Sequence, residues 1–139
     1  MTIRCEIVSQ DHVVYSGEAD IVLLPGAAGA MGILPNHSPL LTALQPGIIT
    51  VRLNQSDNYF TVSGGVAEVQ PDQVTILADA AEDVEKINLQ RAEEAKKRIE
   101  AILAKGVPPD SDQYLTLKAA LHRSNLRINA FNRFHQKNG

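Results

Sequence analysis

The sequence has no tryptophan and only three phenylalanines and three tyrosines among its 139 residues. Aromatic side chains therefore supply little of the core, which must be built from Val, Ile, Leu and Ala. Cys5 is the single cysteine, so an internal disulfide is excluded and a cysteine-based metal site lacks ligands. The four histidines show no HExxH motif or other paired spacing, and we expect no metal site.

Long apolar runs are also missing. No stretch approaches the roughly 18 uncharged apolar residues that a membrane-spanning helix needs. The first residues lack the basic and apolar regions of a signal peptide. We therefore expect a chain that does not insert into a membrane, located in the cytoplasm or attached to a membrane through a partner.

Basic residues are scarce in the first part of the chain, and acidic residues are missing from the last part. Residues 1–80 contain two basic residues against eight acidic ones, whereas residues 113–139 contain five basic residues and no acidic one. The basic segment predicts an acidic partner. Nucleic acid is a weaker candidate, because Phe131 and Phe134 within this segment have the spacing of a helical packing face.

The first eighty residues contain short runs of β-branched and aliphatic residues about ten residues apart. Ile3, Cys5 and Ile7 alternate with polar positions, and later runs end at Pro25-Gly26 and Pro46-Gly47. Strands of this length, each ended by turn residues, are typical of an antiparallel sandwich or barrel.

From about residue 82 the spacing changes to that of helices. Residues 88–104 and 113–134 repeat apolar positions every three or four residues. Asn88 is a suitable N-cap and Gly106 a suitable residue after the first helix. The Pro-rich link between the two segments predicts an antiparallel hairpin.

The stretch GILPNHSPLL, residues 32–41, raises the possibility of an active site around His37. A catalytic histidine needs a nucleophile or an orienting carboxylate, and the nearest acids along the chain are Asp20 and Asp57. Pro35 and Pro39 instead restrict the backbone on either side. We interpret the stretch as a stiff surface turn, with a catalytic His37 as the alternative, and predict no catalytic residue.

Phosphate binding could come from glycine loops or from arginines. The sequence contains no P-loop motif, and glycines between short strands are typical of turns and bulges. Arg91 and Arg98 share one face of the first predicted helix, and Arg123 and Arg127 share one face of the second. They form either a solvated basic surface or a shared site for a polyphosphate.

Two motifs give the chain a family resemblance. Residues 32–47 contain GILPNHSPLLT and LQPG, and residues 62–79 contain VSGGVAEV and VTILAD. Both resemble, in the same order, signatures of the epsilon subunit of the bacterial F-type ATP synthase, and the resemblance covers essentially the whole chain. It implies a β-sandwich of about ten antiparallel strands over residues 1–84 and a C-terminal antiparallel two-helix hairpin over residues 85–139.

The resemblance implies a non-catalytic rotor subunit of the central stalk, which couples rotation of a proton-driven c-ring to the catalytic head. The sandwich would dock to the gamma subunit and to the c-ring loops, at the cytoplasmic face of the cell membrane. The docking loop implied by the resemblance comprises Met31, Gly32, Pro35, His37 and Pro39. Ala30 departs from relatives that carry an acidic residue next to the c-ring.

The resemblance also implies that the hairpin switches between a compact form and an extended form that suppresses ATP hydrolysis. In the extended form, a basic face would be attracted to an acidic segment of the beta subunit. In this chain the basic face comprises Lys118, Arg123, Arg127 and Arg133.

Some members of the family bind ATP in the compact hairpin through an Ile/Leu-Asp-x-x-Arg-Ala motif, which reads INLQRA at residues 87–92 here. No cofactor is required, and ATP would be a regulatory ligand. Asn88 keeps an acceptor oxygen but loses the charge of the family's Asp, which predicts weaker binding. An ATP-sensing module is the alternative function, and an independent enzyme is a third. The implied ATP-site residues are Glu82, Ile87, Asn88, Arg91, Ala92, Arg98, Arg123 and Arg127.

Overall fold

The computed structural model describes residues 1–135. It divides the chain into two compact units, one from Met1 to Val84 and one that begins at Glu85. Residues 136–139, which end the predicted hairpin and include the basic residue Lys137, lie outside the described part.

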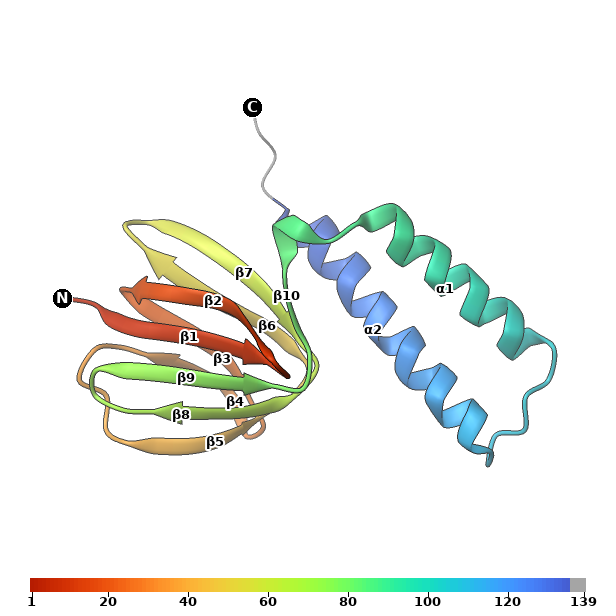
Figure 1. The fold of residues 1–139 in the computed structure, drawn as a ribbon, viewed down its shortest axis with the longest axis horizontal. Helices are drawn as coiled ribbons and strands as arrows, with labels where there is room; N and C mark the ends of the chain where they lie inside the picture. Colours follow the sequence, from red (N-terminus) through yellow and green to blue (C-terminus); the bar gives the residue numbers. More distant parts are fainter. Residues whose placement is uncertain (136–139) are drawn as a thin grey trace. The chain divides into compact units, whose positions relative to one another are not determined.

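The first unit consists of strands joined by short turns (Figure 1). Their hydrogen-bonded order is β10-β7-β6-β3-β5-β8-β9-β1-β2, with β4 paired to β3 outside this order. The ten strands found in this part of the described chain are β1 (Ile3–Ser9), β2 (His12–Ala19), β3 (Ile21–Gly26), β4 (Gly29–Ile33), β5 (Leu40–Leu44), β6 (Gly47–Leu53), β7 (Ser56–Val62), β8 (Gly65–Val69), β9 (Gln73–Ala78) and β10 (Ala81–Asp83).

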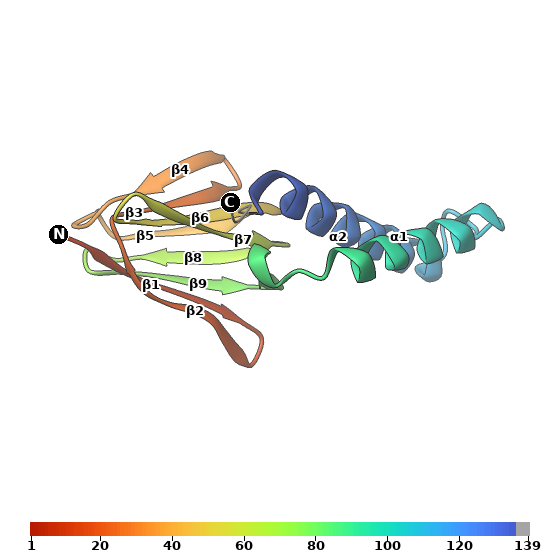
Figure 2. The same ribbon diagram turned by 90° about the horizontal axis from the view of Figure 1, so that it is seen from above.

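The sheet folds into two layers at the junction of β3 and β5, which share a single ladder pair, Gly26 with Leu44. One layer contains β10, β7, β6, β3 and β4, and the other contains β5, β8, β9, β1 and β2. Figure 2 shows β3, β4 and β6 on one side of the sandwich and β1, β2, β8 and β9 on the other. The two ends of the strand order, β10 and β2, contact each other, so the sandwich is nearly closed. The predicted sandwich of about ten strands is confirmed.

One ladder differs from the predicted antiparallel arrangement. Strand β1 pairs with β9 in parallel, with Arg4 opposite Gln73 and Ser9 opposite Ala78. Parallel neighbours need a long connection rather than a tight turn. Strands β2 to β8 lie between these two strands along the chain. This connection is long enough for β1 and β9 to run in the same direction.

The core lies between the two layers and is aliphatic, as the composition predicts. Ile3, Cys5 and Ile7 are fully buried on one face of β1, which follows from the period-two alternation of the strand. Phe60 on β7 is buried and packs against Tyr15 on β2, with ring centroids 5.2 Å apart. This contact joins the two layers.

The second unit begins with a short 3-10 turn, Val84–Lys86, that overlaps the unit boundary, followed by helices α1 (Leu89–Ala104) and α2 (Asp112–Phe134). The helices run antiparallel and contact each other (Figure 1). Asn88 Oδ1 accepts a hydrogen bond from the Arg91 N–H at 3.0 Å, which caps α1. Gly106, with φ +91°, directly follows Lys105, the C-cap residue of α1. The predicted helices and caps are therefore confirmed.

Candidate functional site

Of the predicted docking residues, Met31 and Gly32 lie in strand β4. Pro35, His37 and Pro39 lie in the segment that connects β4 to β5, which is fixed by backbone hydrogen bonds. Asn36 has a left-handed φ of +67°, and its N–H donates to the Pro71 carbonyl at 2.8 Å. The His37 N–H donates to the Leu34 carbonyl at 3.3 Å. His37 Nδ1 lies 2.7 Å from the Ser38 carbonyl oxygen, so the imidazole is oriented by its own loop. This geometry fits a fixed surface side chain.

The five residues predicted for docking differ in their accessibility. Met31 is half-buried and packs against the core, whereas Gly32 and Pro39 are exposed. Pro35 and His37 are half-buried. The accessible part of the predicted loop is therefore its outer edge, with Met31 anchoring the other side.

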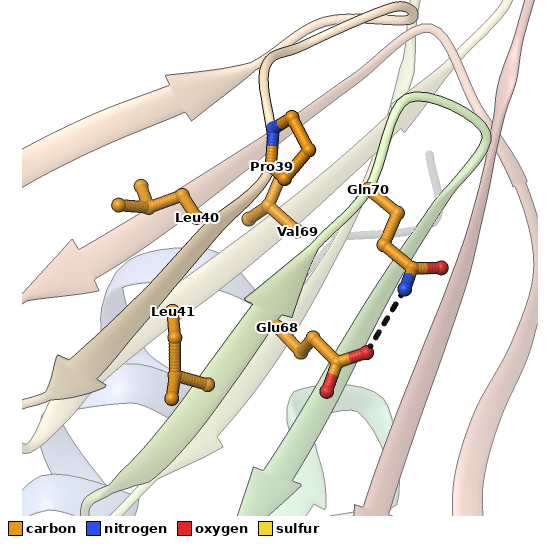
Figure 3. A pocket seen from close by; sticks show the side chains of 6 residues that line it. All are labelled: Pro39, Leu40, Leu41, Glu68, Val69 and Gln70. Atoms are coloured by element: carbon orange, nitrogen blue, oxygen red, sulfur yellow. Dashed lines mark hydrogen bonds between the residues drawn. The ribbon is translucent and has the colours of Figure 1, made fainter.

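A hollow lies beside this loop, over the paired strands β5 and β8 (Figure 3). Leu41 at its margin is 69% exposed, and Gln70 Nε2 donates to Glu68 Oε1 at 3.2 Å. The hollow therefore combines an apolar wall with a polar rim. Its lining residues are Pro39, Leu40, Leu41, Glu68, Val69 and Gln70.

A row of aliphatic side chains crosses the outer face of the same layer. The ladders place Ala43 opposite Val66, Val66 opposite Leu77, Leu77 opposite Val8, and Val8 opposite Val13. Val13 is 59%, Leu77 55% and Val66 39% exposed. We call these five residues the apolar row. The sequence alone does not reveal the row, because alternation marks outward positions but does not show which strands are neighbours.

Polar side chains border the apolar row on the same face. Arg4 Nη2 donates to Ser16 Oγ at 2.6 Å, and Arg4 Nε lies 3.4 Å from Glu6 Oε1. Gln73 Nε2 donates to Thr75 Oγ1 at 3.0 Å. These polar groups bond one another, whereas the row presents apolar surface to water. An exposed apolar patch with a polar border is characteristic of a protein–protein interface.

The predicted ATP-site residues are divided between the two units. Glu82 lies in β10 of the first unit, and the other seven lie in the second. Ile87 and Ala92 are buried, and Asn88 uses its side-chain oxygen to cap α1. The four arginines occupy the two helices, where Arg127 is half-buried and the others are exposed: Arg91, Arg98, Arg123 and Arg127.

The predicted basic face is spread around α2. Each residue advances an α-helix by about 100°, so Arg123 and Arg127 lie close together on one side. Lys118 and Arg133 lie on a neighbouring side, and the four cover roughly half of the helix circumference. The Arg133 guanidinium carbon lies 5.2 Å from the centroid of the Phe134 ring.

Residues 1–135 contain neither a metal-binding cluster nor a membrane-spanning helix. Within this range, no group of three His, Cys, Asp or Glu side chains is placed to hold a metal ion. None of the helices in the same range combines the length and the apolar character needed to cross a membrane.

A β-sandwich with an exposed apolar row, followed by a capped helical hairpin, defines a protein of two compact units. Residues 2–84 match the family model of the ATP synthase delta/epsilon chain β-sandwich domain, and residues 85–132 match that family's long α-helix domain. The chain therefore belongs to the ATP synthase delta/epsilon chain family, as an epsilon subunit of the F-type enzyme. Such a subunit is an accessory, non-catalytic part of the rotary complex.

Curated relatives agree with this assignment. The chain is 43% identical to an ATP synthase epsilon chain of Dehalococcoides mccartyi over 91% of its own length and 89% of the relative's. It is 39% identical to the epsilon chain of Acidithiobacillus ferridurans over 99% and 96% of the two lengths.

The fold also matches solved structures. A chain in the mitochondrial ATP synthase of Euglena gracilis superposes with a TM-score of 0.74 at 23% identity, covering 93% of this chain and 81% of the other. A chain in the Tetrahymena thermophila mitochondrial ATP synthase gives a TM-score of 0.55 at 17% identity, covering 94% and 97%. These similarities concern the fold.

Proposed function

We propose that this subunit is a rotor component of the central stalk, coupling rotation of a proton-driven c-ring to the catalytic head at the cytoplasmic face of the cell membrane. Two observations support the proposal. The family assignment gives the complex, and the apolar row leaves Val13, Val66 and Leu77 exposed on one face, as in surfaces that a partner covers. A nearly closed sandwich also resists deformation under torque, because its ladders connect all ten described strands.

In this proposal the gamma subunit docks on the apolar row, and the c-ring loops contact the fixed turn around His37. The row carries the proposal, since Leu77 and Val13 are exposed aliphatic side chains with no polar function of their own. Burial of apolar area contributes about 25 cal/mol per Å². The turn around His37 differs from the apolar row, because it presents a rigid backbone and the adjoining hollow instead of a broad apolar surface.

The test is binding of the purified chain to purified gamma subunit. Leu77→Asp places a charge in the centre of the row, and we expect the affinity to fall at least about tenfold. Leu34→Asp is the matched control, because Leu34 is 56% exposed, close to the 55% of Leu77, and lies outside the row. Unchanged binding of Leu77→Asp, or an equal loss for Leu34→Asp, would remove the row as the gamma surface.

We also propose that the hairpin restrains ATP hydrolysis through attraction of Lys118, Arg123, Arg127 and Arg133 to an acidic segment of the beta subunit. The absence of acids after Asp112 supports this role. Replacing Arg123, Arg127 and Arg133 by Ala should weaken inhibition most at low salt, because screening reduces the attraction. Replacing Lys96, Lys97 and Lys105 by Ala removes three charges from the region of α1 and is the control. If both triple variants inhibit equally, charge position is irrelevant and the proposal fails.

Truncation after Val84 tests whether the first unit supports coupling and the second restrains ATP hydrolysis. The sandwich has its own core, so we expect the truncated chain to fold and to support coupling while ATP hydrolysis is less restrained. Unfolding of the truncated chain would contradict an independent sandwich.

ATP sensing by the hairpin is the second candidate function. It is favoured by four arginines on two helices that contact each other, because guanidinium groups suit polyphosphates. In this view ATP is a regulatory ligand bound weakly in the compact hairpin.

A further inference from the structure

An ion pair joins the two ends of the second unit. His135 Nδ1 lies 3.1 Å from Glu85 Oε2. Glu85 belongs to the 3-10 turn before α1, and His135 is the residue that ends α2. Because the helices run antiparallel, these two residues meet at the open end of the hairpin, opposite the Pro-rich link.

His135 is held in position by α2 itself. Its N–H donates to the Phe131 carbonyl at 2.9 Å. Its ring stacks on the Phe131 ring, with centroids 4.2 Å apart and an angle of 17° between the planes. Exposed ion pairs lose much of their value to side-chain entropy. The His135 ring is already fixed by stacking and by the helix end. Forming this pair therefore costs less side-chain entropy than forming most surface pairs.

The helices bury few side chains, so a modest contact can decide whether the hairpin stays closed. In the described part of α1 and α2, the buried residues are Ala92, Ser124 and Ala130. None of these is large, and small side chains contribute little apolar area. A closing contact at the open end therefore acts on a marginal element.

Glu85 is the carboxylate in contact with the His135 imidazole. Other charged residues lie near the pair along the chain, four of them basic and four acidic. They are Glu82 and Asp83 in β10, Lys86 before α1, Arg91, Glu93 and Glu94 in the first turns of α1, and Arg127 and Arg133 in the last turns of α2.

We propose that Glu85 and His135 form a latch that closes the open end of the helical hairpin. The Glu85 carboxylate reaches an imidazole that stacking on Phe131 already holds, so the contact forms at a low cost in side-chain entropy. Without the contact, this end depends on the packing of the two helices and opens more often. The latch lies within the hairpin and does not depend on the proposed partners.

The test is amide hydrogen exchange of the full chain at neutral pH. Protection factors, corrected for intrinsic rates, are compared for residues 90–94 of α1 and 128–133 of α2. Glu85→Gln should lower protection roughly two- to fivefold. His135→Gln should do the same, and the double variant should lose no more than either single variant.

Two controls keep the result interpretable. His122→Gln changes another exposed histidine of α2 and should leave protection unchanged. Glu85→Gln lies outside both helices, so it tests the latch even if His135→Gln frays the end of α2. Unchanged protection in Glu85→Gln, or additive losses in the double variant, would overturn the latch.

Discussion

Arg52 and Asp57 face each other across the β6–β7 ladder and are joined by two hydrogen bonds, Nε to Oδ1 at 2.7 Å and Nη2 to Oδ2 at 3.0 Å. The hydroxyl of Tyr59 donates to the same Oδ2 at 3.2 Å. The pair lies next to the two-residue turn Asn54–Gln55, where both residues have left-handed φ values, +53° and +66°. Such a turn matches the twist of a hairpin but is unfavourable for a residue other than Gly or Asn. The ion pair therefore fastens the hairpin beside its strained turn.

The first prediction concerns the pH dependence of the stability that the Arg52–Asp57 pair contributes. The hydrogen bond from Arg52 holds the pKa of Asp57 below its ordinary value. A carboxyl whose pKa is lower in the folded state stabilises the fold at neutral pH, and this stabilisation is lost as pH falls through the folded pKa. Asp57→Asn should lower the melting temperature at pH 7 by a few degrees at most, since exposed pairs contribute little. The difference should vanish by about pH 2.

Circular dichroism melts at both pH values measure this difference. Asp11→Asn, in the exposed β1–β2 turn, is the control for removal of one negative charge. A deficit in Asp57→Asn that persists unchanged in strong acid would show that the carboxylate's charge is not its cause.

The second prediction separates backbone strain from steric clash at two glycines. Gly65 and Gly29 have almost the same φ, +138° and +137°. A Cβ at Gly65 would lie 2.8 Å from Ala78 Cα and would also collide with the Leu77 carbonyl, whereas a Cβ at Gly29 would meet nothing within 4 Å. Gly29→Ala should cost about 1 kcal/mol and Gly65→Ala about 3 kcal/mol or more of unfolding free energy. Urea unfolding measures both, and equal losses would assign the whole effect to φ.

The sequence predicts the strands rich in β-branched residues but not β4 and β10. Strand β4 reads GAMGI, with two glycines and one β-branched residue, which resembles a turn. It forms because β3 supplies a complete ladder from Val22 to Gly26. Strand β10 has three residues and pairs only with β7 among the described ladders. In both cases the partner strand, rather than local propensity, imposes the conformation.

In the candidate site, too, local sequence signals do not specify features that depend on distant parts of the chain. Local signals are sufficient for the stiff turn around His37, and for the caps at Asn88 and Gly106, because each depends on residues close in the chain. The apolar row depends on neighbours far apart in sequence. Val8 and Leu77 meet through the parallel β1–β9 ladder, which no turn signal specifies.

The third prediction concerns Cys5. Burial raises the pKa of the Cys5 thiol to about 12, and the negative charge of Glu6 adds to the shift. The thiolate is the reactive form of cysteine, so a thiol reagent at about pH 8 should not label the native chain. Labelling should become fast once denaturant unfolds the sandwich. A Cys5→Ala, Leu77→Cys variant, whose new thiol lies on the exposed face, should react quickly under native conditions. Rapid native labelling of Cys5 would show that β1 opens readily.

The fourth prediction concerns nucleotide binding by the hairpin. Asn88 caps α1 through its side-chain oxygen, and Asp caps a helix about as well as Asn. Asn88→Asp should therefore leave the helix intact while adding a charged acceptor, which forms stronger hydrogen bonds to the amino or hydroxyl groups of a nucleotide. We expect weak MgATP binding by the natural chain and binding about tenfold tighter in Asn88→Asp. Isothermal titration measures both.

The control for this gain is a variant that combines Asn88→Asp with Arg98→Ala. Arg98 is an exposed residue of α1, so its replacement should preserve the helix and remove one guanidinium from the predicted phosphate site. The double variant should lose most of the gain, because a guanidinium contributes a charge-assisted bond to phosphate. If the gain persists without Arg98, that arginine lies outside the nucleotide site. If Asn88→Asp gives no gain, the charge lost at residue 88 does not limit nucleotide binding.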